Sequence, residues 1–293
     1  MDTGGHNSLG GNYHPLFNDE NADIILQSLE GTLYRTHSFT LRTTSGFFRT
    51  MLSLPQSKEM ESDGAPIAVF EHDAPLEGIL RMMCGLEVPK WHSFDEVEAV
   101  LSLIEKFDAP GPNSVVRSAV HSPMFVAEPL RLYALATHFE WADVTNMALM
   151  ETLKLDLLSE QNRQNLRRLS SQSLLVLLDF HETCKNHLKA TLDNPVFFSA
   201  GNNDPRTCSC SRSIDNYKWR TLKSKIISEF SRRPLGDNVI AEVEVWPESL
   251  ACWDAICRCG ILYYQRIPTI RNIKIAVESA VENAQSSLTS SDS

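Results

Sequence analysis

Signals that would point to a membrane protein or a common enzyme class are missing from this sequence of 293 residues. The longest clearly apolar run is Leu174–Leu178, far too short to cross a bilayer, and no apolar segment with a positive flank stands at the N-terminus. There is no glycine-rich loop followed by lysine and serine or threonine, and no nucleophile elbow. We therefore expect a soluble protein with no membrane partner and no enzymatic activity.

Basic residues are also in short supply. The chain has 27 Lys and Arg against 37 Asp and Glu, a formal charge of -10, so we expect no nucleic-acid partner bound mainly through its phosphates. The deficit is uneven: residues 1–122 hold 8 basic and 17 acidic side chains (8 - 17 = -9), and residues 123–293 hold 19 and 20. Residues 205–233 carry 8 basic and 2 acidic side chains, a local +6.

Cysteine is too sparse for a disulfide framework. Seven cysteines, an odd number, indicate a reducing compartment, and the sequence does not choose between cytoplasm and nucleus. The 42% of hydrophobic residues are enough for sizeable cores, and the length favours two domains.

The stretch 22–55 shows the clearest local pattern. Ile24 and Leu26 alternate with Ile25 and Gln27 as in a short strand, Glu30-Gly31 supplies a turn, and residues 32–36 resume with β-favouring types. From Phe39 to Leu52 the apolar spacing becomes helical. The stretch therefore predicts a hairpin followed by one helix.

The same stretch resembles the opening of a BTB/POZ domain. The resemblance is carried by the spacing of six signature residues, which are Asp23, Tyr34, His37, Leu41, Ser45 and Phe48. It implies an α+β fold, a short mixed sheet flanked by helices, and binding to other proteins through self-association or through a cullin scaffold. Ser38 stands where many members of the family place a basic residue.

The rest of the first half fits this order. Residues 67–71 predict a strand, residues 74–85 a helix, and Ser93 caps a further helix to Phe107. Asn113 is predicted to cap a short helix over 114–120. We assign residues 21–122 to the BTB/POZ-like domain and residues 1–20, rich in Gly, Asn and Asp, to a disordered lead.

From Pro123 the pattern is helical, and we predict an all-α region over 123–280 followed by a disordered tail over 281–293. Its expected helices cover 129–141, 143–157, 173–192 and 216–230. The layout resembles fungal BTB proteins that carry a helical C-terminal region.

No histidine or carboxylate is placed for catalysis. His37 lacks a nearby nucleophile with an orienting acid, so we interpret it as a structural histidine bonded to backbone, as the resemblance implies. Pairs such as Glu96 and Glu98 are explained by a solvent-facing helix.

Late cysteines and histidines suggest a structural zinc site instead. The predicted ligands are Cys184, Cys208, Cys210 and Cys257, with His181 and Cys259 as alternatives. On one continuous helix Cys257 and Cys259 would lie about 200° apart, so they share an ion only if a helix ends near Gly260. The alternative is that these are ordinary buried cysteines.

The segment 217–233 is basic and amphipathic. Trp219, Leu222, Ile226 and Phe230 form one apolar stripe, and the basic side chains cover the remaining surface. A solvated helix face is the simpler interpretation; an acidic partner or nucleic acid is the alternative.

Three functions remain open. The leading hypothesis is a non-enzymatic interaction protein, an adaptor or scaffold made of a BTB domain and a helical region. A narrower alternative is a substrate adaptor of a cullin-type ubiquitin ligase. The third is a transcription-associated regulator with a structural zinc site.

Overall fold

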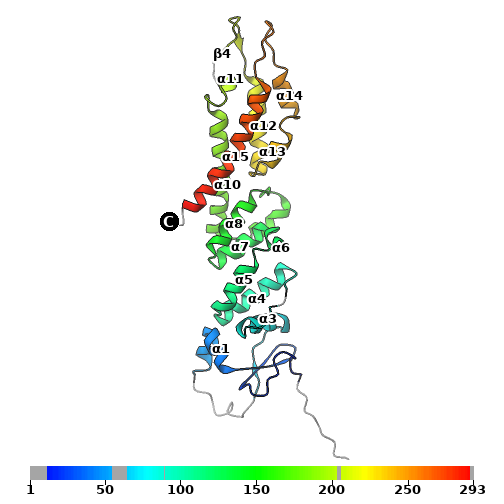
Figure 1. Cartoon of the computed structure of the whole chain (residues 1–293), viewed down its shortest axis with the longest axis vertical. Helices are drawn as coiled ribbons and strands as arrows, with labels where there is room; N and C mark the ends of the chain where they lie inside the picture. Colours follow the sequence, from blue (N-terminus) through cyan, green and yellow to red (C-terminus); the bar gives the residue numbers. More distant parts are fainter. Residues whose placement is uncertain (1–11, 55–64, 89, 203–205, 291–293) are drawn as a thin grey trace, which may run out of the picture. The chain divides into compact units, whose positions relative to one another are not determined.

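The computed structural model describes residues 12–54, 65–88, 90–202 and 206–290. It is an α+β protein, mostly helical with two small sheets, as predicted at the level of fold class. The chain divides into two compact units, Met1–Phe125 and Val126–Ser293. Figure 1 shows the helices and strands of each unit.

A three-stranded sheet forms the base of the first unit. Strand β1 (Ile24–Gln27) pairs antiparallel with β2 (Leu33–Thr36) and parallel with β3 (Ile67–Ala68), in the order β2-β1-β3. The turn between β1 and β2 contains Gly31 at a φ of 85°, a conformation that glycine adopts without strain. The predicted hairpin is confirmed, and the predicted third strand is shorter than expected.

The segment 12–20 packs against this hairpin, so the predicted disordered lead is wrong for these residues. Tyr13 forms a bridge with Leu33, the ring of His14 stacks on Tyr34 with centroids 4.9 Å apart, and Phe17 is only 4% exposed. Three aromatic rings supply the buried contact that the polar composition concealed. Residues 1–11 lie outside the described part of the chain.

Two helices, rather than the single predicted one, follow the hairpin. They are α1 (Ser38–Thr44) and α2 (Gly46–Met51), separated by Ser45 in an extended conformation. The Ser45 hydroxyl accepts a hydrogen bond from the Phe48 N–H and donates one to the carbonyl of Phe107. Because Ser45 is extended and caps α2, helix α1 ends at the preceding residue, Thr44.

Four more helices complete this part of the chain: α3 (Asp73–Met83), α4 (Phe94–Phe107), α5 (Pro110–Ala119) and α6 (Pro123–Val126). The predicted cap of α4 is confirmed, since the Ser93 side chain accepts from the Glu96 N–H. The predicted cap at Asn113 is wrong, because α5 already begins at Pro110. A proline at the first helical position loses no helical hydrogen bond.

The second unit is built on long helices. Its elements are α7 (Pro129–His138), α8 (Ala142–Thr152), η1 (Glu160–Asn162), α9 (Arg163–Leu166), α10 (Ser171–Asp193), α11 (Ser199–Asn202), β4 (Arg206–Thr207), β5 (Ser213–Ile214), α12 (Tyr217–Arg232), α13 (Asp237–Glu242), α14 (Pro247–Trp253) and α15 (Arg266–Ser290). The prediction of an all-α region is wrong at one place, where β4 and β5 form a two-stranded antiparallel sheet. None of the helices in the described ranges combines the length and apolar character needed to cross a bilayer.

Helix α10 packs along α15 and also against α12, and these three helices contribute to the core of this unit. The buried side of α15 includes Ile273, Val277, Ala280 and Ala284, spaced as on one helical face. The predicted disordered tail is therefore wrong for residues 281–290, which continue this helix, and residues 291–293 lie outside the described part. The serine-rich composition indicated disorder, but buried alanines such as Ala280 and Ala284 pack this helix into the unit.

Candidate metal centre

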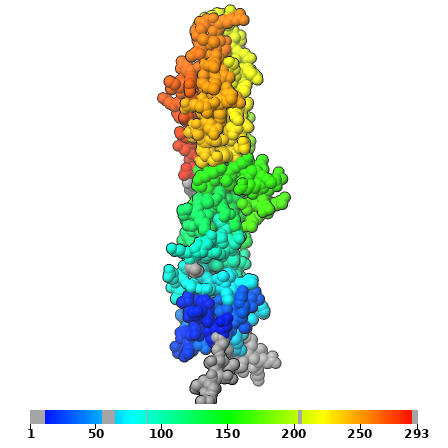
Figure 2. Space-filling view, turned by 90° about the vertical axis from the view of Figure 1, so that its right-hand side faces the viewer, coloured from blue at the N-terminus to red at the C-terminus, as the bar shows by residue number. Residues whose placement is uncertain are grey.

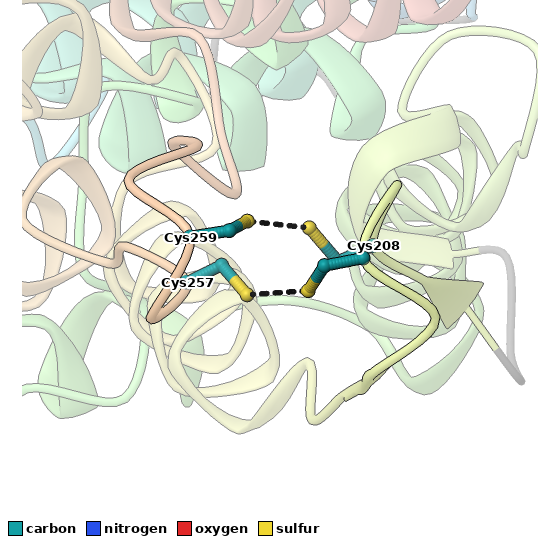
Figure 3. Close-up of side chains that lie close together, drawn as sticks. Cys208, Cys257 and Cys259 are labelled. Atoms are coloured by element: carbon teal, nitrogen blue, oxygen red, sulfur yellow. Dashed lines mark hydrogen bonds between the residues drawn. The ribbon is translucent and has the colours of Figure 1, made fainter.

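Four cysteines from two distant segments meet in the second unit. Cys208 and Cys210 belong to the β4–β5 hairpin, and Cys257 and Cys259 to the loop between α14 and α15. All four Sγ atoms lie within 4.8 Å of one another. The Sγ atoms of Cys208 and Cys259 are 3.3 Å apart, and those of Cys210 and Cys257 are 3.5 Å apart (Figure 3).

The first pair sits in a tight turn. Arg206 and Thr207 pair with Ile214 and Ser213, which brings the ends of the segment 208–212 together. The Cys208 N–H donates to the Arg212 carbonyl over 2.8 Å, and the Ser211 N–H donates to the Cys208 carbonyl over 2.8 Å. Ser211 has a φ of 62° and so closes the turn.

The second pair sits in a turn of the same design. Ile256 bridges Leu262, the Cys257 N–H donates to the Ile261 carbonyl over 2.9 Å, and the Gly260 N–H donates to the Cys257 carbonyl over 2.8 Å. Gly260 has a φ of 87°, the position that Ser211 holds in the first turn. Because α14 ends at Trp253, Cys257 and Cys259 are not on a helix, and both sulfur atoms turn toward the other pair.

This arrangement suits a tetrahedral zinc ion. Four sulfur ligands about 2.3 Å from a zinc ion lie about 3.8 Å from one another. The observed sulfur separations scatter around that value. A set of four thiolates fills the coordination of the metal and leaves no position for substrate, which is typical of a structural site.

The backbone favours the thiolate form of one ligand. The N–H of Cys259 donates to the sulfur of Cys257 and is the main reason that the pKa of Cys257 falls to about 6. The N–H of Ile261 lowers the pKa of Cys259 in the same way, but the neighbouring sulfurs of Cys208 and Cys257 outweigh it and raise that pKa to about 12. Crowded thiolates repel one another unless a cation lies between them.

Side chains around the cluster tie the two turns together. Ile214 and Tyr263 pack against Cys208 and Cys257, which are both buried. The Arg206 guanidinium donates to the carbonyls of Ala200, over 2.5 Å, and Tyr263, over 3.0 Å. The hairpin and the loop thus contact each other through these side chains, and the four thiols lie where the two segments meet.

Two residues of the predicted zinc set lie elsewhere. Cys184 is fully buried in the helical core, with its sulfur 3.4 Å from the Ala280 carbonyl, and burial raises its pKa to about 12. His181 pairs with the Thr152 hydroxyl over 3.0 Å, and burial lowers its pKa to about 4. Cys259, predicted as an alternative, takes the place of Cys184. The signal for this choice was the matching pattern of Cys208-x-Cys210-Ser211 and Cys257-x-Cys259-Gly260.

The six signature residues of the first unit occupy structural positions. Tyr34, Leu41, Ser45 and Phe48 are fully buried. Asp23 accepts hydrogen bonds from the backbone and hydroxyl of Ser38, at the first turn of α1. His37 is bonded to the Asp19 carboxylate over 3.0 Å, so the predicted bond of its side chain to backbone is wrong.

The basic face of α12 is largely paired. Its predicted apolar stripe is buried, which confirms the amphipathic reading. On the other side the ion pairs are Arg220 with Asp215, Lys223 with Asp193, Lys225 with Glu229, Arg232 with Asp156, and Arg233 with Asp237. These pairs support the interpretation of a solvated helix face.

Comparison with known proteins adds no assignment to this geometry. No model of a known protein family matches the sequence, and no curated protein matches it.

Proposed function

We propose that this chain is a non-enzymatic interaction protein, an adaptor or scaffold, with a BTB/POZ-type domain over residues 21–122 and a helical region that holds a structural zinc ion. The observation that carries the first part is the order of elements, hairpin, two short helices, a third strand and then α3, α4 and α5. This is the order expected from the resemblance to BTB domains, including the fungal BTB proteins with a helical C-terminal region.

A surface for protein contact is available on the first unit. Phe39 on α1 is 76% exposed, and Phe47 on α2 and Leu54 after it are exposed as well. A hollow of about 540 Å³ is lined by Gly46, Phe47, Thr50, Met51, Leu54, Lys106 and Asp108. Exposed apolar side chains beside a hollow are typical of sites where another protein docks.

The adaptor role is tested by affinity purification of the full chain from native extract. Phe39→Asp should lose the partner proteins that the unmodified chain retains, because it places a charge in the apolar contact. Leu86→Asp, a matched change of another exposed residue of the first unit, should retain them. Equal recovery with both variants would contradict a docking role for α1 and α2.

The cullin alternative is favoured by the same exposed surface. Full chain mixed with a purified cullin N-terminal region should form a stable complex in light-scattering chromatography, and Phe47→Asp should weaken it. Failure to form a complex, under conditions in which an established BTB adaptor binds the same cullin, would refute this alternative.

The zinc ion is supported by the four-thiol cluster and its two matching turns. When bound, zinc would cross-link the hairpin and the α14–α15 loop, and Cys208, Cys210, Cys257 and Cys259 would hold it. Native mass spectrometry should find one zinc per chain, removed by a strong chelator. Protein purified without chelator that contains no zinc would refute the site.

A zinc site would support the alternative of a transcription-associated regulator. The ion pairs on the basic face of α12 argue against this alternative, because they occupy the side chains that would bind nucleic acid.

A further inference from the structure

The end of the second unit that carries the four cysteines has the character of a binding surface. We infer that it docks an acidic protein segment with aliphatic or aromatic anchor residues. The inference rests on the proposed adaptor function and names the surface and partner chemistry of the helical region. We call this region the cysteine-end surface, made of residues 196–202, 206–220 and 254–272. Figures 1 and 2 show the hairpin and the α14–α15 loop side by side at this end of the unit.

Large apolar side chains are unusually exposed here. Val196 is 87% exposed and Ile267 is 81% exposed, and Ile256, Ile261 and Leu262 on the second cysteine turn are also exposed. Isolated apolar residues on a surface need no explanation, but a group on neighbouring segments marks an interaction site. The second cysteine turn therefore presents apolar side chains to solvent, while its two sulfurs turn toward Cys208 and Cys210.

Two neighbouring hollows offer places for anchor side chains. The larger, of about 540 Å³, is lined in part by Phe197, Trp219 and Leu262. The smaller, of about 340 Å³, is lined in part by Tyr217, Lys218 and Ile256. Tyr263 and Tyr264 line both. An extended segment with two apolar anchors a few residues apart fits this arrangement.

The charge of the surface selects an acidic partner. Its three ranges contain seven basic residues and two acidic ones (7 - 2 = +5), in a chain whose formal charge is -10. Arg220 is paired with Asp215, whereas Arg212, Lys218 and Arg258 form no ion pair with any residue in the described part of the chain. Unpaired basic side chains around an apolar centre attract acidic residues flanking an apolar anchor.

A protein segment explains the surface better than a nucleic acid does. Single-stranded nucleic acids bind through bases stacked on exposed aromatic rings together with basic side chains. The two most exposed large side chains here are aliphatic, Val196 and Ile267. Among the aromatic rings only Tyr217 is more than half exposed, at 65%, and the Trp219 ring is buried against Phe198. Aliphatic side chains offer no stacking surface, and they do match leucine, isoleucine or phenylalanine anchors of a peptide.

Peptide display against the zinc-loaded full chain tests the inference. Selection from a random library of 12-residue peptides should enrich sequences that combine acidic residues with aliphatic or aromatic ones. The affinity of a selected peptide should fall at least tenfold with Arg258→Glu and with Ile267→Asp. It should change less than twofold with Arg167→Glu and Leu175→Asp, which alter an exposed basic and an exposed apolar residue elsewhere in the second unit.

Three outcomes would overturn the inference: no enrichment of acidic peptides, equal effects of all four variants, or tighter, salt-sensitive binding of a mixed-sequence oligonucleotide that Arg258→Glu abolishes. The zinc content of each variant is measured in the same samples. Acidic peptides bound by protein that never contains zinc would refute the zinc site and leave the docking surface standing. Loss of partner proteins with Phe39→Asp is a separate test of the adaptor role.

Discussion

Cys259 and Cys184 show that the surroundings of a cysteine side chain decide whether it can serve as a metal ligand. Both are cysteines in the second unit, yet the Cys259 sulfur lies 3.3 Å from that of Cys208, and the Cys184 sulfur faces the carbonyls of Ala280 and Pro234 inside the helical core. Thiolate ligands need neighbouring donors around one point, and a thiol packed among apolar helices has none. Their roles therefore differ.

Replacing these two residues separately tests the ligand set. We expect Cys259→Ser to lose most of the bound zinc, because three thiolates bind the ion far more weakly than four. We expect Cys184→Ser to keep one zinc per chain, measured by native mass spectrometry. The reverse result would restore Cys184 to the set that the sequence alone suggested.

His181 gives the second unit a dependence on pH. Burial lowers its pKa to about 4 from the usual 6.5, so between these values the unfolded chain binds a proton that the folded chain does not. The free energy of unfolding should therefore fall as the pH is lowered from about 6.5 to 4, by on the order of 3 kcal/mol at most. Urea denaturation at several pH values measures this.

The matched variant for this measurement is His181→Gln, which can still bond to Thr152 but does not titrate. Other groups also titrate in this range, so the difference between the two proteins is the informative quantity. Parallel stability curves for both would show that His181 makes no contribution.

At the scale of elements, Asp73 joins the hairpin to α3. It is the first residue of that helix, and its carboxylate accepts from the hydroxyls of Thr32, over 2.7 Å, and Tyr34, over 3.0 Å. Burial raises the pKa of Asp73, but hydrogen bonds from Ser28, Thr32 and Tyr34 outweigh burial and lower it below 3.8. The charged form is therefore the one that stabilises the fold, helped by the helix N-terminus.

We expect Asp73→Ala to lower the free energy of unfolding by about 2 kcal/mol, since hydrogen bonds to a charged group are lost. Tyr34→Phe should cost about 1 kcal/mol and cost less in the Asp73→Ala background. Asp73 contributes its stability above pH about 4 and loses it as the pH falls through its lowered pKa. Denaturation of the two single variants and the double variant, at pH 7 and pH 3, measures both effects, and fully additive costs would contradict the bond.

Elements with a strong local pattern were predictable and those fixed by contacts were not. The cap at Ser93 predicted the start of α4 correctly, because the capping serine and the residues it bonds are neighbours in the sequence. The break between α1 and α2 depends on the bond from Ser45 to Phe107, a partner 62 positions away. The position of segment 12–20 likewise depends on Leu33 and the ring of Tyr34, both in β2, which no local pattern of that segment contains.

At the scale of the molecule, a bound zinc ion would stabilise the second unit alone. Its ligands come from segments separated by 51 and 47 positions along the chain, so the ion closes long loops there. We expect a chelator to lower the denaturation midpoint followed by tryptophan fluorescence, because Trp141, Trp219, Trp246 and Trp253 all lie in that unit. Cys259→Ser should start near the lowered midpoint and not respond to chelator. Equal responses of both proteins would exclude stabilisation through the cluster.

The sequence by itself determined the fold class, the amphipathic helices and the presence of closely spaced late cysteines, because composition and periodicity are properties of neighbouring residues. Only the tertiary structure decided which four cysteines meet, since that depends on two turns closing on each other across the unit. It also decided that residues 281–290 are helical, because Ala284 is buried. Contacts between distant segments, rather than local preference, set both outcomes.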